Sequence, residues 1–98
     1  IEYAVFFGTR IDENKFSKLY RFVIKELYQA ETEGFVEICR DIIQLSENKD
    51  ELRRPCSLNS TFYYELNLSA LTIVRNLKLI LERLDLTDEL FIKFRGNV

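Results

Sequence analysis

Residues 60–84 read STFYYELNLSALTIVRNLKLILERL and carry the strongest periodic pattern in the chain. Apolar side chains recur along this stretch at three- and four-residue steps: Phe62, Leu66, Ala70, Ile73, Leu77, Leu81 and Leu84. Further leucine and valine side chains widen the apolar face on both flanks. A helix that is buried by more than one neighbour has this pattern. We therefore expect one long helix over residues 60–85.

A second amphipathic pattern covers residues 12–46 and begins at Asp12, a favoured helix N-cap residue. Gly34 leaves two alternatives open within this stretch. It either ends a first helix, with Thr32 capping the next, or it interrupts one long helix. A glycine inside a helix costs only about 1 kcal/mol relative to alanine, so packing can override it. We slightly favour a continuous or kinked helix, with a pair of helices as the alternative.

Three weaker segments surround these two helices. Residues 47–59 are polar and contain Pro55, which predicts a loop between the helices. Thr87 is a suitable N-cap with acidic residues behind it, and it predicts a short helix over residues 87–95. Residues 1–10 are mainly apolar and form a short strand or an extended arm.

Together these segments predict an all-α fold: an elongated antiparallel bundle of three to five helices, two of them long, with the N-terminal strand or arm. The 98 residues suit one domain with one hydrophobic core. The chain contains no Met, and we expect it to be a fragment of a larger protein. It has no apolar run long enough to span a membrane and no recognisable signal peptide, so we expect an intracellular, cytoplasmic protein.

The composition argues against catalysis. The sequence has no His, which removes imidazole bases, Cys–His nucleophile pairs and zinc sites that use histidine. Cys39 and Cys56 are too few for a zinc site, and we favour reduced thiols over a disulfide bridge. Glu33, Glu37 and Asp41 share one helix face, where an exposed salt-bridged surface is the simplest interpretation. We expect no enzyme activity, no cofactor and no metal.

The function that these patterns favour is that of a protein–protein interaction or assembly domain. Its helix faces are wider than one apolar stripe, its N-terminal segment is apolar, and surface aromatic side chains are common interface anchors. The partner is another protein or a second copy of the chain. The residues expected to contact it are Tyr3, Val5, Phe6, Phe7, Tyr63 and Tyr64. We expect the N-terminal segment to dock on a second chain, as a swapped segment or an added strand.

The alternative function is a helical module that binds phosphate, an inositol phosphate or polyphosphate. Lys18, Arg21 and Lys25 stand at positions i, i+3 and i+7, so they line one face of the expected first helix. Arg53 and Arg54 add an adjacent basic pair in the polar loop. A solvated helix face is the competing interpretation of this stripe. The formal net charge of −2 argues against nucleic acid as a partner.

Overall fold

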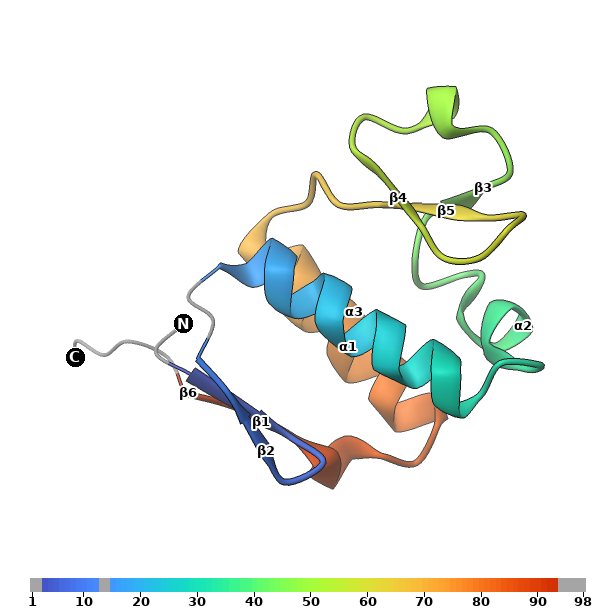
Figure 1. The fold of residues 1–98 in the computed structure, drawn as a ribbon. Coiled ribbons are helices and arrows are strands. Elements are labelled where there is room, and N and C mark those ends of the chain that lie inside the picture. Colours follow the sequence, from blue (N-terminus) through green and yellow to red (C-terminus); the bar gives the residue numbers. More distant parts are fainter. Residues whose placement is uncertain (1–2, 13–14, 94–98) are drawn as a thin grey trace.

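A pair of long helices lies between two small antiparallel sheets in the computed structural model, which describes residues 3–12 and 15–93 (Figure 1). Sheet A has the strand order β2-β1-β6 and sheet B the order β3-β5-β4. The strands are β1 (Tyr3–Phe6), β2 (Thr9–Ile11), β3 (Leu45–Ser46), β4 (Pro55–Ser57), β5 (Tyr63–Glu65) and β6 (Leu90–Lys93). The helices are α1 (Phe16–Ala30), α2 (Phe35–Cys39) and α3 (Ala70–Arg83), with the 3-10 turns η1 (Lys49–Glu51) and η2 (Thr87–Glu89).

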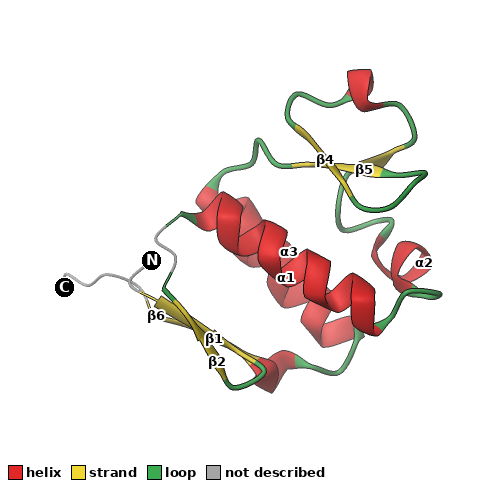
Figure 2. Cartoon of the chain, viewed as in Figure 1, coloured by secondary structure: helices red, strands yellow, loops and turns green. Residues whose placement is uncertain are grey.

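The expected all-α antiparallel bundle is therefore wrong. The described residues form six strands in two antiparallel sheets, and Figure 2 shows these sheets on opposite sides of the helical layer. The two long helices are also not antiparallel: α1 and α3 run side by side in the same direction (Figure 1). Within that expectation the short N-terminal strand is present, as β1.

The long helix expected over residues 60–85 is split into a strand and a helix. Tyr64 pairs with Cys56 on one side and with Leu45 on the other, so cross-strand hydrogen bonds override the local helical pattern. The helix begins only at Ala70. Its N-cap is Ser69, whose hydroxyl accepts a hydrogen bond from the Thr72 amide at 3.1 Å. The spacing of Phe62 and Leu66 matches the apolar period of α3 only by coincidence, because neither residue belongs to that helix.

The stretch 12–46 is a pair of helices rather than one helix, and residues 13–14 lie outside the described part. Helix α1 ends at Ala30, and α2 starts at Phe35 after a turn. Gly34 has a φ of −102°, so it is not a left-handed C-terminal residue. The expected N-cap Asp12 is also wrong, because α1 begins at Phe16 with Lys15 as its N-cap residue. Asp12 instead accepts a hydrogen bond from the Arg10 side chain at 2.8 Å.

The two remaining segments also differ from the expectation. The expected loop at residues 47–59 contains η1 and β4. The expected helix at residues 87–95 is the 3-10 turn η2 followed by strand β6, which pairs with β1 over four residues. Residues 1–2 of the expected arm and 94–95 of the expected helix lie outside the described residues. The sequence missed β6 because its pairing partner is more than 80 positions away along the chain.

One buried polar contact joins the two long helices. Asn76 of α3 donates a hydrogen bond from Nδ2 to the Tyr20 hydroxyl of α1 at 3.1 Å. Both side chains lie in the core, with exposures of 4% and 0%. Tyr20 belongs to the same hydrophobic core as Leu19, Val23, Ile24, Leu27, Ile73, Leu77 and Ile80.

We predict opposite effects for alanine at two glycines. Gly8 has a φ of +77°, where a Cβ is strained, so Gly8→Ala should lower the free energy of unfolding by about 1–2 kcal/mol. Gly34 has a helical conformation, and a Cβ there would meet Ile38 Cδ1 at an ordinary 3.5 Å. Gly34→Ala should therefore raise the free energy by about 0.4–1 kcal/mol. Urea denaturation measures both changes, and effects of equal sign would contradict the two backbone conformations.

A double-mutant cycle tests the contact between the long helices. Tyr20→Phe leaves the Asn76 amide without its acceptor in the core, which should lower the free energy of unfolding by about 1–3 kcal/mol. In the double variant Tyr20→Phe/Asn76→Leu neither polar group remains, so part of that loss should be recovered. Denaturation curves of the four proteins give the coupling. Strictly additive losses would show that the two groups do not interact.

Candidate functional site

The six residues expected to contact a partner are divided among the core and two separate surfaces. Alternation along β1 buries Ala4 and Phe6 against the helices and turns Tyr3 and Val5 to the outer face of sheet A. Phe7 follows β1 in the hairpin turn and is 48% exposed. Tyr64 is buried in sheet B and Tyr63 next to it is half-buried. The structure thus brings Tyr3, Val5 and Phe7 to sheet A and leaves Phe6 and Tyr64 inside.

The outer face of sheet A carries an aromatic group that the sequence analysis did not place. Phe91 of β6 stands opposite Val5 and is 54% exposed. Its ring centroid lies 6.3 Å from that of Tyr3. The guanidinium carbon of Arg10 lies 4.1 Å from the Tyr3 ring centroid, which adds a cation–π contact. Phe91 was missed because residues 87–95 were expected to form a helix.

Strand β1 has neighbours at both edges within its own chain. Its register with β2 pairs Val5 with Arg10, and its register with β6 pairs Val5 with Phe91. A second chain therefore cannot add a strand to β1 in this fold. The strands that expose an edge of sheet A are β2 and β6.

An apolar groove lies along the open edge of β6, between this strand and α3. Its volume is about 230 Å³. We call it the β6 groove, and its lining residues are Val74, Leu77, Lys78, Leu81, Thr87, Leu90 and Ile92. Lys78 is the charged residue of this lining, and no carboxylate belongs to it. Leu71 lies one turn before Val74 and Arg75 on α3 and is 81% exposed.

The hydrogen-bond pattern of sheet A shows which backbone groups of β6 face outward. The Phe7 amide donates to the Glu89 carbonyl at 2.9 Å, just beyond the Phe6–Leu90 pair. Because hydrogen-bonded and non-hydrogen-bonded pairs alternate in antiparallel sheets, Val5 and Phe91 form the next bonded pair. The amides and carbonyls of Leu90 and Ile92 therefore point away from β1. Among the described residues, no strand pairs with β6 on that side.

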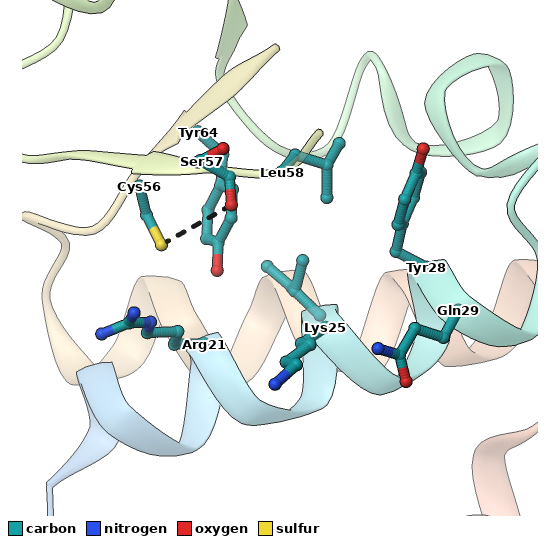
Figure 3. A pocket seen from close by; sticks show the side chains of 9 residues that line it. Arg21, Lys25, Tyr28, Gln29, Cys56, Ser57, Leu58 and Tyr64 are labelled. Atoms are coloured by element: carbon teal, nitrogen blue, oxygen red, sulfur yellow. Dashed lines mark hydrogen bonds between the residues drawn. The ribbon is translucent and has the colours of Figure 1, made fainter. Parts of the chain in front are cut away.

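A second hollow lies on the other side of the helical layer, between α1 and sheet B (Figure 3). Its volume is about 370 Å³. We call it the α1–sheet B cleft. Helix α1 contributes Arg21, Ile24, Lys25, Tyr28 and Gln29, and the β4–β5 region contributes Cys56, Ser57, Leu58 and Tyr64.

Hydroxyl groups and two cations surround this cleft. The Tyr28 hydroxyl accepts a hydrogen bond from Asn59 Nδ2 at 3.1 Å, so its own proton remains available for donation. Burial is the main cause that raises the pKa of Tyr64, and its contact with Cys56 adds to the increase. The Tyr64 phenol therefore keeps its proton at neutral pH.

The structure divides the five expected anion-binding residues among three places. Arg21 and Lys25 line the α1–sheet B cleft, while Lys18, one turn earlier on α1, is exposed outside it. Arg53 and Arg54 have exposed side chains, and their backbone amides donate hydrogen bonds to the Glu65 carboxylate. The sequence located the basic stripe, but only the tertiary fold adds the residues of the β4–β5 region to it.

The group that holds Arg53 and Arg54 is the Glu65 carboxylate, which is only 6% exposed. It accepts hydrogen bonds from the amides of Arg53 at 2.7 Å, Arg54 at 2.9 Å and Asn67 at 2.9 Å. Burial alone would raise the pKa of Glu65, but the three amide donors outweigh it and hold this pKa below its ordinary value. Glu65 thus fixes the segment before β4 against the end of β5.

The described residues provide little for metal or acid–base chemistry. Residues 3–12 and 15–93 contain no group of three or more cysteine, aspartate or glutamate side chains placed to hold a metal ion. Asp41 of the expected acidic face forms a bidentate pair with Arg83, whose Nη2 lies 2.9 Å from Oδ2. This hydrogen bonding lowers the pKa of Asp41. Both cysteines are free thiols, and burial raises the pKa of Cys39 to about 11.

No helix within the described part of the chain has the length and apolar character that crossing a membrane requires. Comparisons with protein-family models, with curated proteins and with solved structures find no match for this chain. The two hollows and the groups that line them are therefore the features of this chain that point to a function.

The Glu65 contacts predict a specific pH dependence of stability. A carboxylate whose pKa is lowered by folding stabilises the fold above its unfolded pKa, and this contribution is lost as pH falls through the folded pKa. Glu65→Gln should therefore lower the free energy of unfolding at pH 7 by about 1.5–3 kcal/mol. Its difference from the wild type should shrink as pH falls below the ordinary value of 4.5.

Urea denaturation between neutral and acidic pH measures this difference. Glu47→Gln serves as the control, because Glu47 is exposed and belongs to no strand of either sheet. This variant should have little effect on stability at any pH. A Glu65→Gln deficit that stays constant down to the most acidic pH would show that the carboxylate charge is not what the three amides bind.

Proposed function

We propose that this chain is a non-catalytic protein-interaction domain, and that the β6 groove takes up an extended peptide segment of a partner protein. The observation that supports the proposal is the open edge of β6 beside an apolar hollow. Among residues 3–12 and 15–93, no strand pairs with the outward backbone groups of Leu90 and Ile92, and their side chains line the same groove. Addition of a strand to such an edge supplies main-chain hydrogen bonds, and adjacent pockets supply selectivity.

The shape of sheet A also favours an added strand. Three strands cover the lower side of two helices in Figure 1, and β6 is the strand beside α3. A fourth strand next to β6 would cover the flank of α3 around Val74. Alternate side chains of that strand would point into the groove, because successive residues of a strand face opposite sides.

The charge of the groove indicates a partner different from the chain itself. Lys78 is the charged residue of the lining, so it favours a segment with an acidic side chain. The β6 strand of a second copy would bring Leu-Phe-Ile-Lys, which contains a lysine and no acid. Self-pairing of β6 would therefore leave Lys78 without an opposite charge. We infer a partner segment that alternates apolar residues and carries Asp or Glu.

A displayed library of short peptides tests this proposal, with affinities then measured for synthetic peptides. The selected sequences should alternate apolar residues and contain an acidic residue. Val74→Glu places a carboxylate in the groove and should weaken binding by about tenfold or more, because it repels the acidic side chain and pairs with Lys78. Leu79→Glu makes the same kind of change elsewhere on α3, outside the groove, and should leave the affinity unchanged.

Three outcomes would contradict the proposal. The library could yield no binder, or its binders could bind Val74→Glu as tightly as the wild type. Sedimentation could also show a wild-type dimer that Val74→Glu dissociates, which would assign the groove to a second copy. NMR adds a direct measurement, since bound peptide should shift the outward amides of Leu90 and Ile92 more than the inward amide of Phe91.

A further inference from the structure

We propose that the α1–sheet B cleft binds a small phosphate monoester that carries one apolar, ring-sized group. Sheet A and sheet B lie on opposite sides of the helical layer (Figure 1). The β6 groove is lined by α3 and the β6 side of sheet A and the cleft by α1 and the β4–β5 region, so this proposal does not depend on the proposed function. It goes beyond the basic stripe seen in the sequence, because it assigns both ends of the ligand to particular side chains.

The charge of the cleft favours an anionic ligand. Arg21 and Lys25 are four residues apart on α1, and like charges at this spacing destabilise a helix by about 0.2–0.5 kcal/mol. No carboxylate belongs to the cleft lining. Within the described residues, the ion pairs are Arg10–Asp12 and Arg83–Asp41, and neither involves these two cations. A ligand with negative charge would offset their repulsion.

Two phenols line the same cleft as the cations. Figure 3 shows the Tyr64 phenol pointing from β5 toward α1, and the Tyr28 phenol rising from α1 toward the β4–β5 region. Both phenols have a proton to donate. A phosphate monoester has about 1.5–2 negative charges at neutral pH and three terminal oxygens. At the Tyr64 end of the cleft it can accept from that phenol and pair with Arg21, whose charge acts on Tyr64, while Lys25 and Tyr28 line the rest of the cleft. A carboxylate there would have one charge and two oxygens.

Part of the cleft lining is apolar. Ile24, Leu58 and the tyrosine rings form apolar walls. A fully hydroxylated ligand would have no apolar surface to pack against them. The volume of about 370 Å³ is near the lower end of the range for small-molecule sites, which is about 300–1,000 Å³. It suits one ring with one phosphate. Inositol polyphosphates and polyphosphate carry more charge than two cations can match and have no apolar part.

Titration with phenyl phosphate tests the proposal, with inorganic phosphate and phenol as the two half-ligands. NMR titrations at about 0.15 M salt suppress non-specific attraction, since the screening length is then about 8 Å. Phenyl phosphate should bind more tightly than either half-ligand. Arg21→Gln and Lys25→Gln should each weaken its binding by about tenfold or more. The matched control is Lys18→Gln, which makes the same charge change on α1 outside the cleft and should change affinity less than about twofold.

Thiol alkylation gives an independent measurement on the same protein. Cys56 lines the cleft, while Cys39 is buried in the core. Bound phenyl phosphate should slow the reaction of Cys56 with iodoacetamide, and the Arg21→Gln/Lys25→Gln double variant should lose this protection. Cys39 reports any global unfolding, because it reacts only when the core opens.

The proposal is overturned if phenyl phosphate causes no saturable shift or protection at millimolar concentration. It is also overturned if the double variant binds as tightly as the wild type, or if Lys18→Gln weakens binding as much as Lys25→Gln does. Equal affinity for inorganic phosphate and phenyl phosphate would remove the apolar half of the assignment. Binding of peptides to the β6 groove should be the same in all these variants, which separates the two tests.

Discussion

The packing of α1 against α3 is the constraint on which the rest of this fold depends. Both sheets are small, and neither has a second layer of its own, so each is stabilised by the helical layer. The Asn76–Tyr20 hydrogen bond is the polar contact at the centre of that layer. Burial raises the pKa of Tyr20 to about 12, so this hydroxyl stays protonated while it accepts from Asn76. Because a buried amide without an acceptor is costly, this contact favours one relative position of the two helices. The positions of the β6 groove on α3 and of the cleft on α1 follow from it.

The sequence predicted helix within the segments of α1 and α3, but neither the bounds of these helices nor the sheets that cover them. Within α1 and α3 the apolar period and the final burial agree, so a local pattern was sufficient for these two segments. Strand β5 has only three residues, too few for a period, and its pairing partners supply its structure. The same holds for β6, whose conformation depends on β1 at the other end of the chain. Glu65 illustrates the limit well: an ordinary charged residue in sequence becomes a buried acceptor for three amides.

The candidate sites were predictable to the same limited degree. The spacing of Arg21 and Lys25 along a helix could be read directly, because both belong to α1. The sequence could not show that Lys18 lies outside the cleft, because this depends on where the β4–β5 region lies over the helix. The phenols that complete the cleft come from two different elements, so no spacing rule connects them. The β6 groove could not be predicted from the sequence, because the strand that forms one of its walls was expected to be a helix.

The aromatic residues around β1 show why exposure alone does not identify an interface. Phe7 has a φ of 50° and precedes Gly8 in a two-residue hairpin turn, a position that Asn or Gly occupies with less strain. A left-handed conformation costs a residue with a Cβ about 1–2 kcal/mol, so Phe7 needs a compensating contact. The contact is present in the chain itself: the Phe7 ring centroid lies 4.6 Å from that of Phe6, which in turn packs edge-on against Phe22. Phe7 therefore shields the end of the core, although half of it is exposed. The β6 edge has no such in-chain contact among the described residues, and that difference is what supports an interaction at β6 rather than at Phe7.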